Sequence, residues 1–182
     1  MNEETNTLIA KIHLNKTNIR DFSDWAVSCL EQDLDTKNIR IVAAMYDATS
    51  LSEIDTYFRR SLNELGWEFP QEKECLERYA KSVAQQIVDK TISPAGGCEV
   101  FYEIHCSLIY LNEEEQFNYF RDLYWCYKYL PVEEIDLKVI QEAERYLSGK
   151  KFIFPKNIEE KPLFAEIDKK ESFLSKIWKK IS

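Results

Sequence analysis

The amino-acid sequence predicts an all-α protein, either an irregular multi-helix bundle or a short helical-repeat-like array. It would hold about seven helices and a basic C-terminal tail helix. The 182 residues include only 4 Gly and 5 Pro, whereas average usage would give about 13 and about 9. So few helix-breaking residues favour long elements with short connections. Apolar residues recur at the three- and four-residue spacing of helices, and strong helix formers dominate these segments.

Three helices are predicted between residues 19 and 65. The first carries the apolar stripe of "NIRDFSDWAVSCLEQ". The second begins after Asp35 or Thr36, because either side chain can cap a helix N-terminus. The third begins after Ser50, which forms a capping-box pattern with Glu53.

Four more helices follow with short links. Their predicted ranges are 71–89, 94–111, 113–130 and 131–147. Ser93 caps the second of these, with Pro94 at its first position. Asn112 caps the third, whose first turn holds three glutamates that suit the positive end of the helix dipole. Gly96 and Gly97 indicate a close helix crossing, because glycine has no Cβ to keep two backbones apart.

The charge is divided unevenly along the chain, whose net charge is −8. Residues 1–149 carry 27 Asp and Glu against 15 Lys and Arg, while residues 150–182 carry 9 Lys against 5 Asp and Glu. We therefore expect an acidic helical domain over 1–149 and a basic extension over 150–182.

The basic extension contains an amphipathic stretch with two interpretations. Its apolar residues are Phe173, Leu174, Ile177, Trp178 and Ile181, and its neighbouring lysines are Lys169, Lys170, Lys176, Lys179 and Lys180. Opposite charge favours docking of this stretch on the acidic domain. The alternative is that it lies on an anionic membrane surface.

The acidic domain disfavours nucleic acid as a partner and favours a basic protein. Residues 36–65 have the outline of a helix-turn-helix, with Arg59 and Arg60 in the second helix. DNA binding would need far more positive charge around them. The simplest alternative explanation of the acidic excess is solubility.

The segment "CEVFYEIHC" holds Cys98, His105 and Cys106 but does not have the spacing of a metal or catalytic site. Cys98 and His105 are seven residues apart, which puts about 10 Å between them along a helix. Zinc sites need closely spaced Cys or His pairs. We expect the cysteines to pack in the core, with no metal, cofactor or catalytic residue. A Cys-dependent enzyme, with Cys98 near a helix N-terminus, is the alternative.

The segment "NEEEQFNYFRDLYWCYKYL" is the densest aromatic stretch and supplies the predicted partner-binding surface. On a helical wheel its core face would hold Phe117, Phe120, Leu123, Tyr124, Tyr127 and Leu130. Trp125 and Tyr129 fall on the opposite side, beside Asn118 and Asp122. Aromatic residues on a polar face are common at interfaces, and the nearby carboxylates suit a cationic target. The alternative is that residues of the C-terminal extension cover this pair.

The compartment is predicted from the cysteines and from the apolar runs. Five cysteines in no regular pattern suggest free thiols in a reducing cytosol. The start of the sequence has no apolar run that would serve as a signal peptide, and no stretch approaches 18 apolar residues. We therefore expect a cytoplasmic protein.

The segments "LNELGWEFP" and "IVDKTISPAGG" resemble stretches of uncharacterised bacterial all-helical proteins, over about residues 20–147. The resemblance implies a helical fold and a bacterial cytoplasmic setting, and it transfers no functional residue. The leading functional hypothesis is a non-catalytic protein-binding module, such as an acidic inhibitor or immunity-type protein that masks a basic partner. The alternatives are a membrane-surface adaptor acting through the basic tail and, third, the Cys-dependent enzyme.

Overall fold

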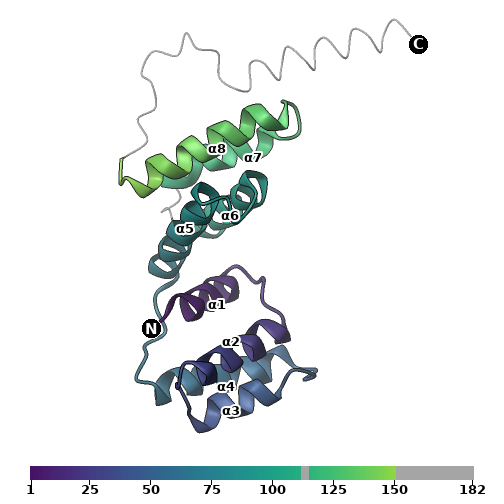
Figure 1. Cartoon of the computed structure of the whole chain (residues 1–182), viewed down its shortest axis with the longest axis vertical. Helices are drawn as coiled ribbons and strands as arrows, with labels where there is room; N and C mark the ends of the chain where they lie inside the picture. Colours follow the sequence, from purple (N-terminus) through teal and green to yellow (C-terminus); the bar gives the residue numbers. More distant parts are fainter. Residues whose placement is uncertain (112–114, 151–182) are drawn as a thin grey trace, which may run out of the picture. The chain divides into compact units, whose positions relative to one another are not determined.

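The computed structural model describes residues 1–111 and 115–150. Within these ranges all regular structure is helical and there are no strands, which confirms the all-α class (Figure 1). The eight α-helices of the described residues are α1 (Glu3–His13), α2 (Ile19–Glu31), α3 (Lys37–Ala44), α4 (Leu51–Glu64), α5 (Glu72–Val88), α6 (Pro94–Leu108), α7 (Asn118–Cys126) and α8 (Val132–Leu147). Two 3-10 helices, η1 (Ile109–Leu111) and η2 (Glu115–Phe117), lie between α6 and α7. None of the described helices is long and apolar enough to cross a membrane.

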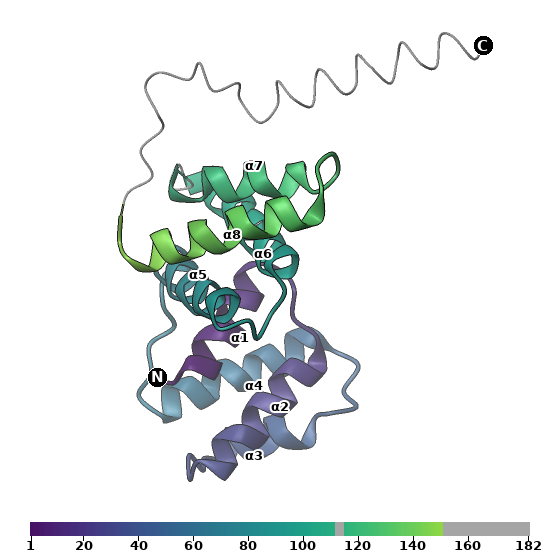
Figure 2. The same cartoon turned by 45° about the horizontal axis from the view of Figure 1, so that its top comes forward.

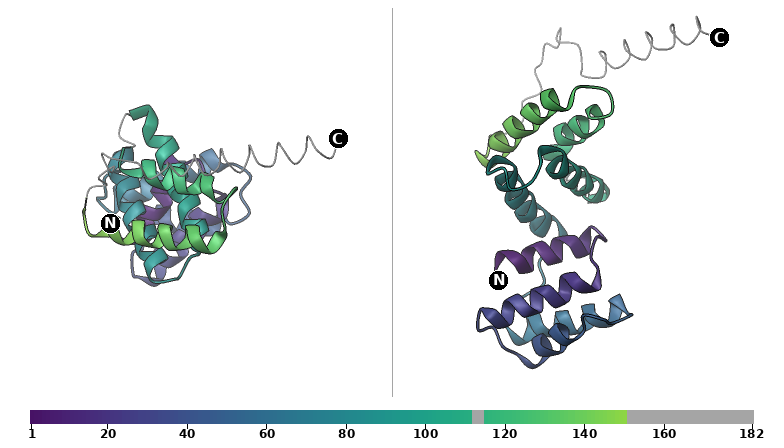
Figure 3. Two further views of the ribbon diagram at one scale, coloured as in Figure 1. Left: turned by 90° about the horizontal axis from the view of Figure 1, so that it is seen from above. Right: turned by 45° about the vertical axis from the view of Figure 1, so that its right-hand side comes forward.

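The chain divides into two compact units, Met1–Ser82 and Val83–Ser182, and the boundary falls inside α5. In the first unit, α2 lies between α1 on one side and the α3–α4 pair on the other (Figure 1 and the right-hand view of Figure 3). The core of this unit is aromatic at its centre. The buried Phe58 ring meets Trp25 edge-on, with 4.7 Å between ring centroids, and Phe22 at 5.4 Å.

Side-chain caps begin the first four helices. The side chains of the four N-cap residues accept a hydrogen bond from the backbone N–H three residues further on: Asn2, Asn18, Thr36 and Ser50. The predicted caps at Thr36 and Ser50 are confirmed. A complete capping box forms at Asn18, because the Asp21 carboxylate also accepts from the Asn18 N–H at 2.8 Å.

The sequence patterns did not predict α1. It is tied to α2 through the indole N–H of Trp25, which donates to the Thr5 hydroxyl at 2.8 Å, and Thr5 in turn donates to Asn2 at 2.6 Å. Asn2 followed by Glu3 and Glu4 is itself a helix-start signal, because acidic residues favour the first turn.

In the second unit, α7 and α8 lie side by side and pack on α6 (Figure 2). Four rings form the centre of this core. Phe101 of α6 stacks on Phe120 of α7, with 3.8 Å between centroids and 5° between planes. Phe117 lies 6.0 Å from Phe101, and Tyr146 of α8 meets Phe101 edge-on at 5.9 Å. These contacts join all three helices through one aromatic cluster.

Of the two glycines predicted to allow a close helix crossing, one is in tight contact with a side chain. A Cβ on Gly97 would lie 2.5 Å from Cγ1 of Ile87, so the Ile87 side chain of α5 packs directly on the α6 backbone because residue 97 has no side chain. Gly96 makes no such approach, because a Cβ there would meet only the Ser93 hydroxyl oxygen. That hydroxyl caps α6 by accepting from the Gly96 N–H at 3.1 Å, as predicted.

The helix predicted over 113–130 is much shorter in the structure. After η2, α7 begins at Asn118 and ends at Cys126, and residues 127–130 form a turn. The N-cap of α7 is Phe117, which makes no side-chain cap hydrogen bond. Pro131 disfavours helical geometry at Leu130, so the helix would not be expected to continue through that residue.

Two further predictions lie outside the described residues. The proposed cap Asn112 is one of them. The basic tail helix falls within 151–182, so its formation and its docking remain predictions.

Candidate binding surface

The cysteine and histidine residues of α6 form no open reactive pair. Cys98 is fully buried, and its thiol donates to the Phe120 carbonyl oxygen at 3.3 Å. Burial raises the pKa of this thiol far above its ordinary value, and the neighbouring Cys126 adds to the rise. A thiol held in this state is a poor nucleophile. His105 is also buried, whereas Cys106 is half-buried on a different side of the helix.

Burial also lowers the reactivity of the other buried thiols. All five cysteines lie within the described residues and are free of disulfides. Burial raises the pKa of Cys29 and of Cys126 to about 11 and that of Cys75 to about 12. In the described ranges, no three His, Cys, Asp or Glu side chains gather as metal ligands would.

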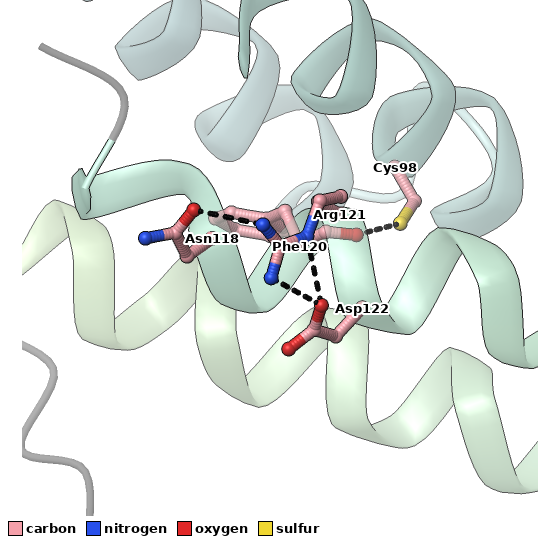
Figure 4. A network of polar contacts seen from close by, with 5 residues as sticks. All are labelled: Cys98, Asn118, Phe120, Arg121 and Asp122. Carbon is pink, nitrogen blue, oxygen red and sulfur yellow. Dashed lines mark hydrogen bonds and ion pairs between the residues drawn. The ribbon is translucent and has the colours of Figure 1, made fainter. Parts of the chain in front are cut away.

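The polar residues of α7 pair with each other. The Arg121 guanidinium donates to the Asp122 carboxylate at 2.7 and 2.9 Å and to the Asn118 side-chain oxygen at 3.3 Å (Figure 4). Both acceptors are half-buried. The negative charge of Asp122 is therefore balanced within its own helix, which reduces its capacity to attract a cationic partner.

Trp125, one of the four predicted binding residues, is half-buried and contacts three neighbours. Its ring meets Tyr102 of α6 and Tyr124 of α7 nearly at right angles, each with 5.8 Å between centroids. The Lys128 ammonium lies 4.2 Å from the ring centroid, a cation–π contact. The indole thus has an aromatic side and a cationic side.

Tyr102 and Tyr124 complete the cluster around Trp125. Their rings stack with 4.4 Å between centroids and 9° between planes, and both side chains are half-buried. The Tyr102 hydroxyl is hydrogen-bonded with the Cys106 thiol, which raises the pKa of Tyr102 above its ordinary value. We call Tyr102, Tyr124 and Trp125 the aromatic surface. Tyr102 lies on α6, and the other two residues lie on α7.

Tyr129, the fourth predicted binding residue, lies beyond the end of α7. It is 39% exposed and belongs to the turn before α8, so the spacing that would pair it with Trp125 on one helix does not apply. Its backbone N–H bonds to the Cys126 carbonyl oxygen at 3.0 Å.

Six residues of this segment were predicted to lie in the core, and three of them are buried there. Phe117, Phe120 and Leu123 are fully buried. Tyr124, Tyr127 and Leu130 are only half-buried. The Tyr127 hydroxyl donates to Asp136 of α8 at 2.7 Å, and burial with this hydrogen bond raises the pKa of the phenol. Tyr124 instead belongs to the aromatic surface.

Sequence reasoning missed Tyr102 as a partner of Trp125. A signal was present, because Tyr102 and Cys106 are four residues apart on α6 and fall beside the stripe of buried residues rather than within it. That stripe contains Cys98, Phe101, Ile104, His105 and Leu108. The stacking with Tyr124 could not be read from spacing, since it depends on how α6 and α7 cross.

Comparison of the chain with protein-family models, with curated proteins and with solved structures finds no match.

Proposed function

We propose that this chain is a non-catalytic protein-binding module whose aromatic surface engages a basic protein partner. The observation that carries the proposal is the cluster of Tyr102, Tyr124 and Trp125, three large rings that contact one another while remaining partly open to solvent. Tyr and Trp are enriched among the residues that dominate binding energy at interfaces. They offer a large contact area at a low cost in conformational entropy.

The mutual contacts favour binding because they restrain the rings before a partner arrives. Tyr102 stacks on Tyr124, and Trp125 meets Tyr102 nearly at right angles, so each ring contacts the other members of the cluster. Part of the ordering cost of an interface is then met in the free protein. Removing one ring would therefore weaken the interface by its own contacts and by loosening the other two.

Charge has a separate role in this proposal. Residues 83–149 carry 12 Asp and Glu against 5 Lys and Arg, an excess that would speed the approach of a basic protein. Asp122 is already paired with Arg121, so we expect it to lie at the edge of the interface without forming a new ion pair. We expect added salt to slow association and the loss of a ring to speed dissociation.

An acidic inhibitor or immunity-type protein in the bacterial cytoplasm would use such a surface. Its task is to cover a basic toxin or enzyme, and fast association with slow dissociation suits that task. This assignment rests on surface chemistry and charge.

The test is a quantitative capture experiment with the full chain as bait. Wild type, Trp125→Ala and the control Tyr46→Ala would be compared in a bacterial lysate at about 50 mM and about 500 mM salt. Tyr46 is a matched control because it is 69% exposed and lies in the first unit. Circular dichroism would verify that each variant is folded.

The expected result is a basic protein recovered by wild type and by Tyr46→Ala, more strongly at low salt. Its recovery should fall about tenfold or more with Trp125→Ala. Equal recovery by all three baits, or recovery of no salt-sensitive protein, would contradict the proposal.

A further inference from the structure

Three consecutive exposed apolar residues follow α6, and none of them belongs to the aromatic surface. They are the three residues of η1, Ile109, Tyr110 and Leu111, which are 46%, 87% and 46% exposed. Single exposed apolar residues are ordinary on protein surfaces, but adjacent ones more often mark a contact site. We call these three residues the η1 patch.

The chain carries negative charge on both sides of the η1 patch. The patch follows the C-terminal end of α6, which is the negative end of the helix dipole. Glu115, the first residue of η2, is exposed and only four residues from Leu111, so their Cα atoms are at most about 15 Å apart. A complementary ligand would be apolar on one side and cationic beside it.

The described chain ends close to this region. Tyr146, in the last turn of α8, contacts the Phe117 ring of η2, with 5.7 Å between centroids. The chain reaches Lys150 only four residues later. The segment after Lys150 therefore starts only a few residues beyond a residue that contacts η2, and η2 is the element after the η1 patch along the chain.

The segment from 169 to 182 has the chemistry that the patch requires. Its five apolar residues recur at three- and four-residue spacing, and its lysines alternate with them. Residues 151–168 can span up to about 60 Å when extended. A tether of this length also gives an effective concentration near the millimolar range, so modest affinity is enough for docking.

We propose that residues 169–182 dock on the η1 patch of the same chain, as an intramolecular cover. The apolar stripe would pack on Tyr110 and Leu111, and the lysines would lie near Glu115 and the end of α6. This contact goes beyond the proposed function, because it uses a different surface and requires no partner.

The test is hydrogen–deuterium exchange of the purified full chain, read at the backbone amides of residues 169–182. The patch variant combines Tyr110→Ser with Leu111→Ser. The control is Leu137→Ser, since Leu137 is 62% exposed on α8 of the same unit but lies outside the patch. Exchange in wild type and in the control should be about tenfold slower than in the patch variant.

Four outcomes would overturn the proposal. The first is fast exchange in wild type, and the second is slow exchange that persists in the patch variant. The third is protection that grows with protein concentration, which would identify a second copy as the occupant. The fourth is protection that appears only with vesicles containing anionic phospholipid, which would identify a membrane surface. Because no partner is present, none of these outcomes tests whether the aromatic surface binds a basic protein.

Discussion

The two units of the chain differ in what fixes the positions of their helices. In the first unit, α1 to α4 each begin at an Asn, Thr or Ser whose side chain accepts a backbone hydrogen bond. In the second unit, α6 has such a cap at Ser93, but α7 and α8 begin without one, and an aromatic cluster joins them to α6. Both units contain buried aromatic contacts between distant residues, but only the first unit has a side-chain cap at the start of each of its helices α1 to α4.

The largest expected effect is the loss of the aromatic cluster in the second unit. Phe101→Ala removes a fully buried ring that contacts Phe117, Phe120 and Tyr146. It should lower the free energy of unfolding by about 3–5 kcal/mol. Denaturant unfolding followed by circular dichroism measures this loss.

The neighbouring residue provides the control for Phe101→Ala. Tyr102 is half-buried, so Tyr102→Ala should cost less than half as much. Equal costs at the two positions would mean that the cluster does not hold the second unit together.

A smaller effect is expected when a cap of the first unit is removed. Asn18→Ala deletes the acceptor of the Asp21 N–H and breaks the capping box of α2, at a cost of about 1–2 kcal/mol in unfolding free energy. The matched variant is Asn118→Ala at the start of α7. It removes no cap, only the 3.3 Å hydrogen bond from Arg121, and should cost about 0.5 kcal/mol. Thermal and denaturant unfolding of both variants would reveal the difference, and a reversed order would break the comparison between the units.

The smallest effect concerns pH and His13 at the end of α1. Burial lowers the pKa of His13, and Arg59 adds to this, while Glu72 and the Pro70 carbonyl act in the opposite direction. Within the described residues, Nε2 of His13 is buried without a hydrogen-bond partner. The folded state therefore disfavours the protonated imidazole. Stability from the neutral ring is complete above the unfolded pKa of about 6.5 and is lost as pH falls below it.

His13→Gln should remove this dependence. Compared with the variant, wild type should lose unfolding free energy between about pH 7.5 and about pH 5, by less than the cost of Asn18→Ala. Chemical denaturation at both pH values measures the difference in unfolding free energy between the two proteins. Titration of the carboxylates affects both proteins equally and therefore cancels in this difference. A constant difference, or a relative gain by wild type in acid, would show that His13 is not held neutral.

Local signals explain which parts of the fold could be predicted. Three helix starts could be predicted because a capping side chain and the N–H that it binds lie only three residues apart. These caps are Thr36, Ser50 and Ser93, and all three are present in the structure. The extent of α7 had no such signal. Its start lies between Phe117 and Phe120, which both pack against Phe101 of α6, so the boundary depends on tertiary contacts.

Only part of the candidate surface could be predicted, because the remainder also depends on tertiary contacts. The position of Trp125 beside the polar side of α7 follows from helical spacing. Its contacts with Tyr102 and Lys128, and the pairing of Asp122 with Arg121, depend on helix crossing and side-chain rotamers. A helical wheel cannot supply these details, because it treats one helix at a time.

The central claim is that the aromatic surface binds a basic protein, and the affinity of the captured partner for matched variants tests it most directly. Titration calorimetry with purified proteins would compare wild type, Trp125→Ala and Tyr46→Ala. We predict a Kd at least about tenfold weaker for Trp125→Ala and within about twofold of wild type for Tyr46→Ala. A Trp125→Ala protein that is folded and binds as tightly as wild type would contradict the claim.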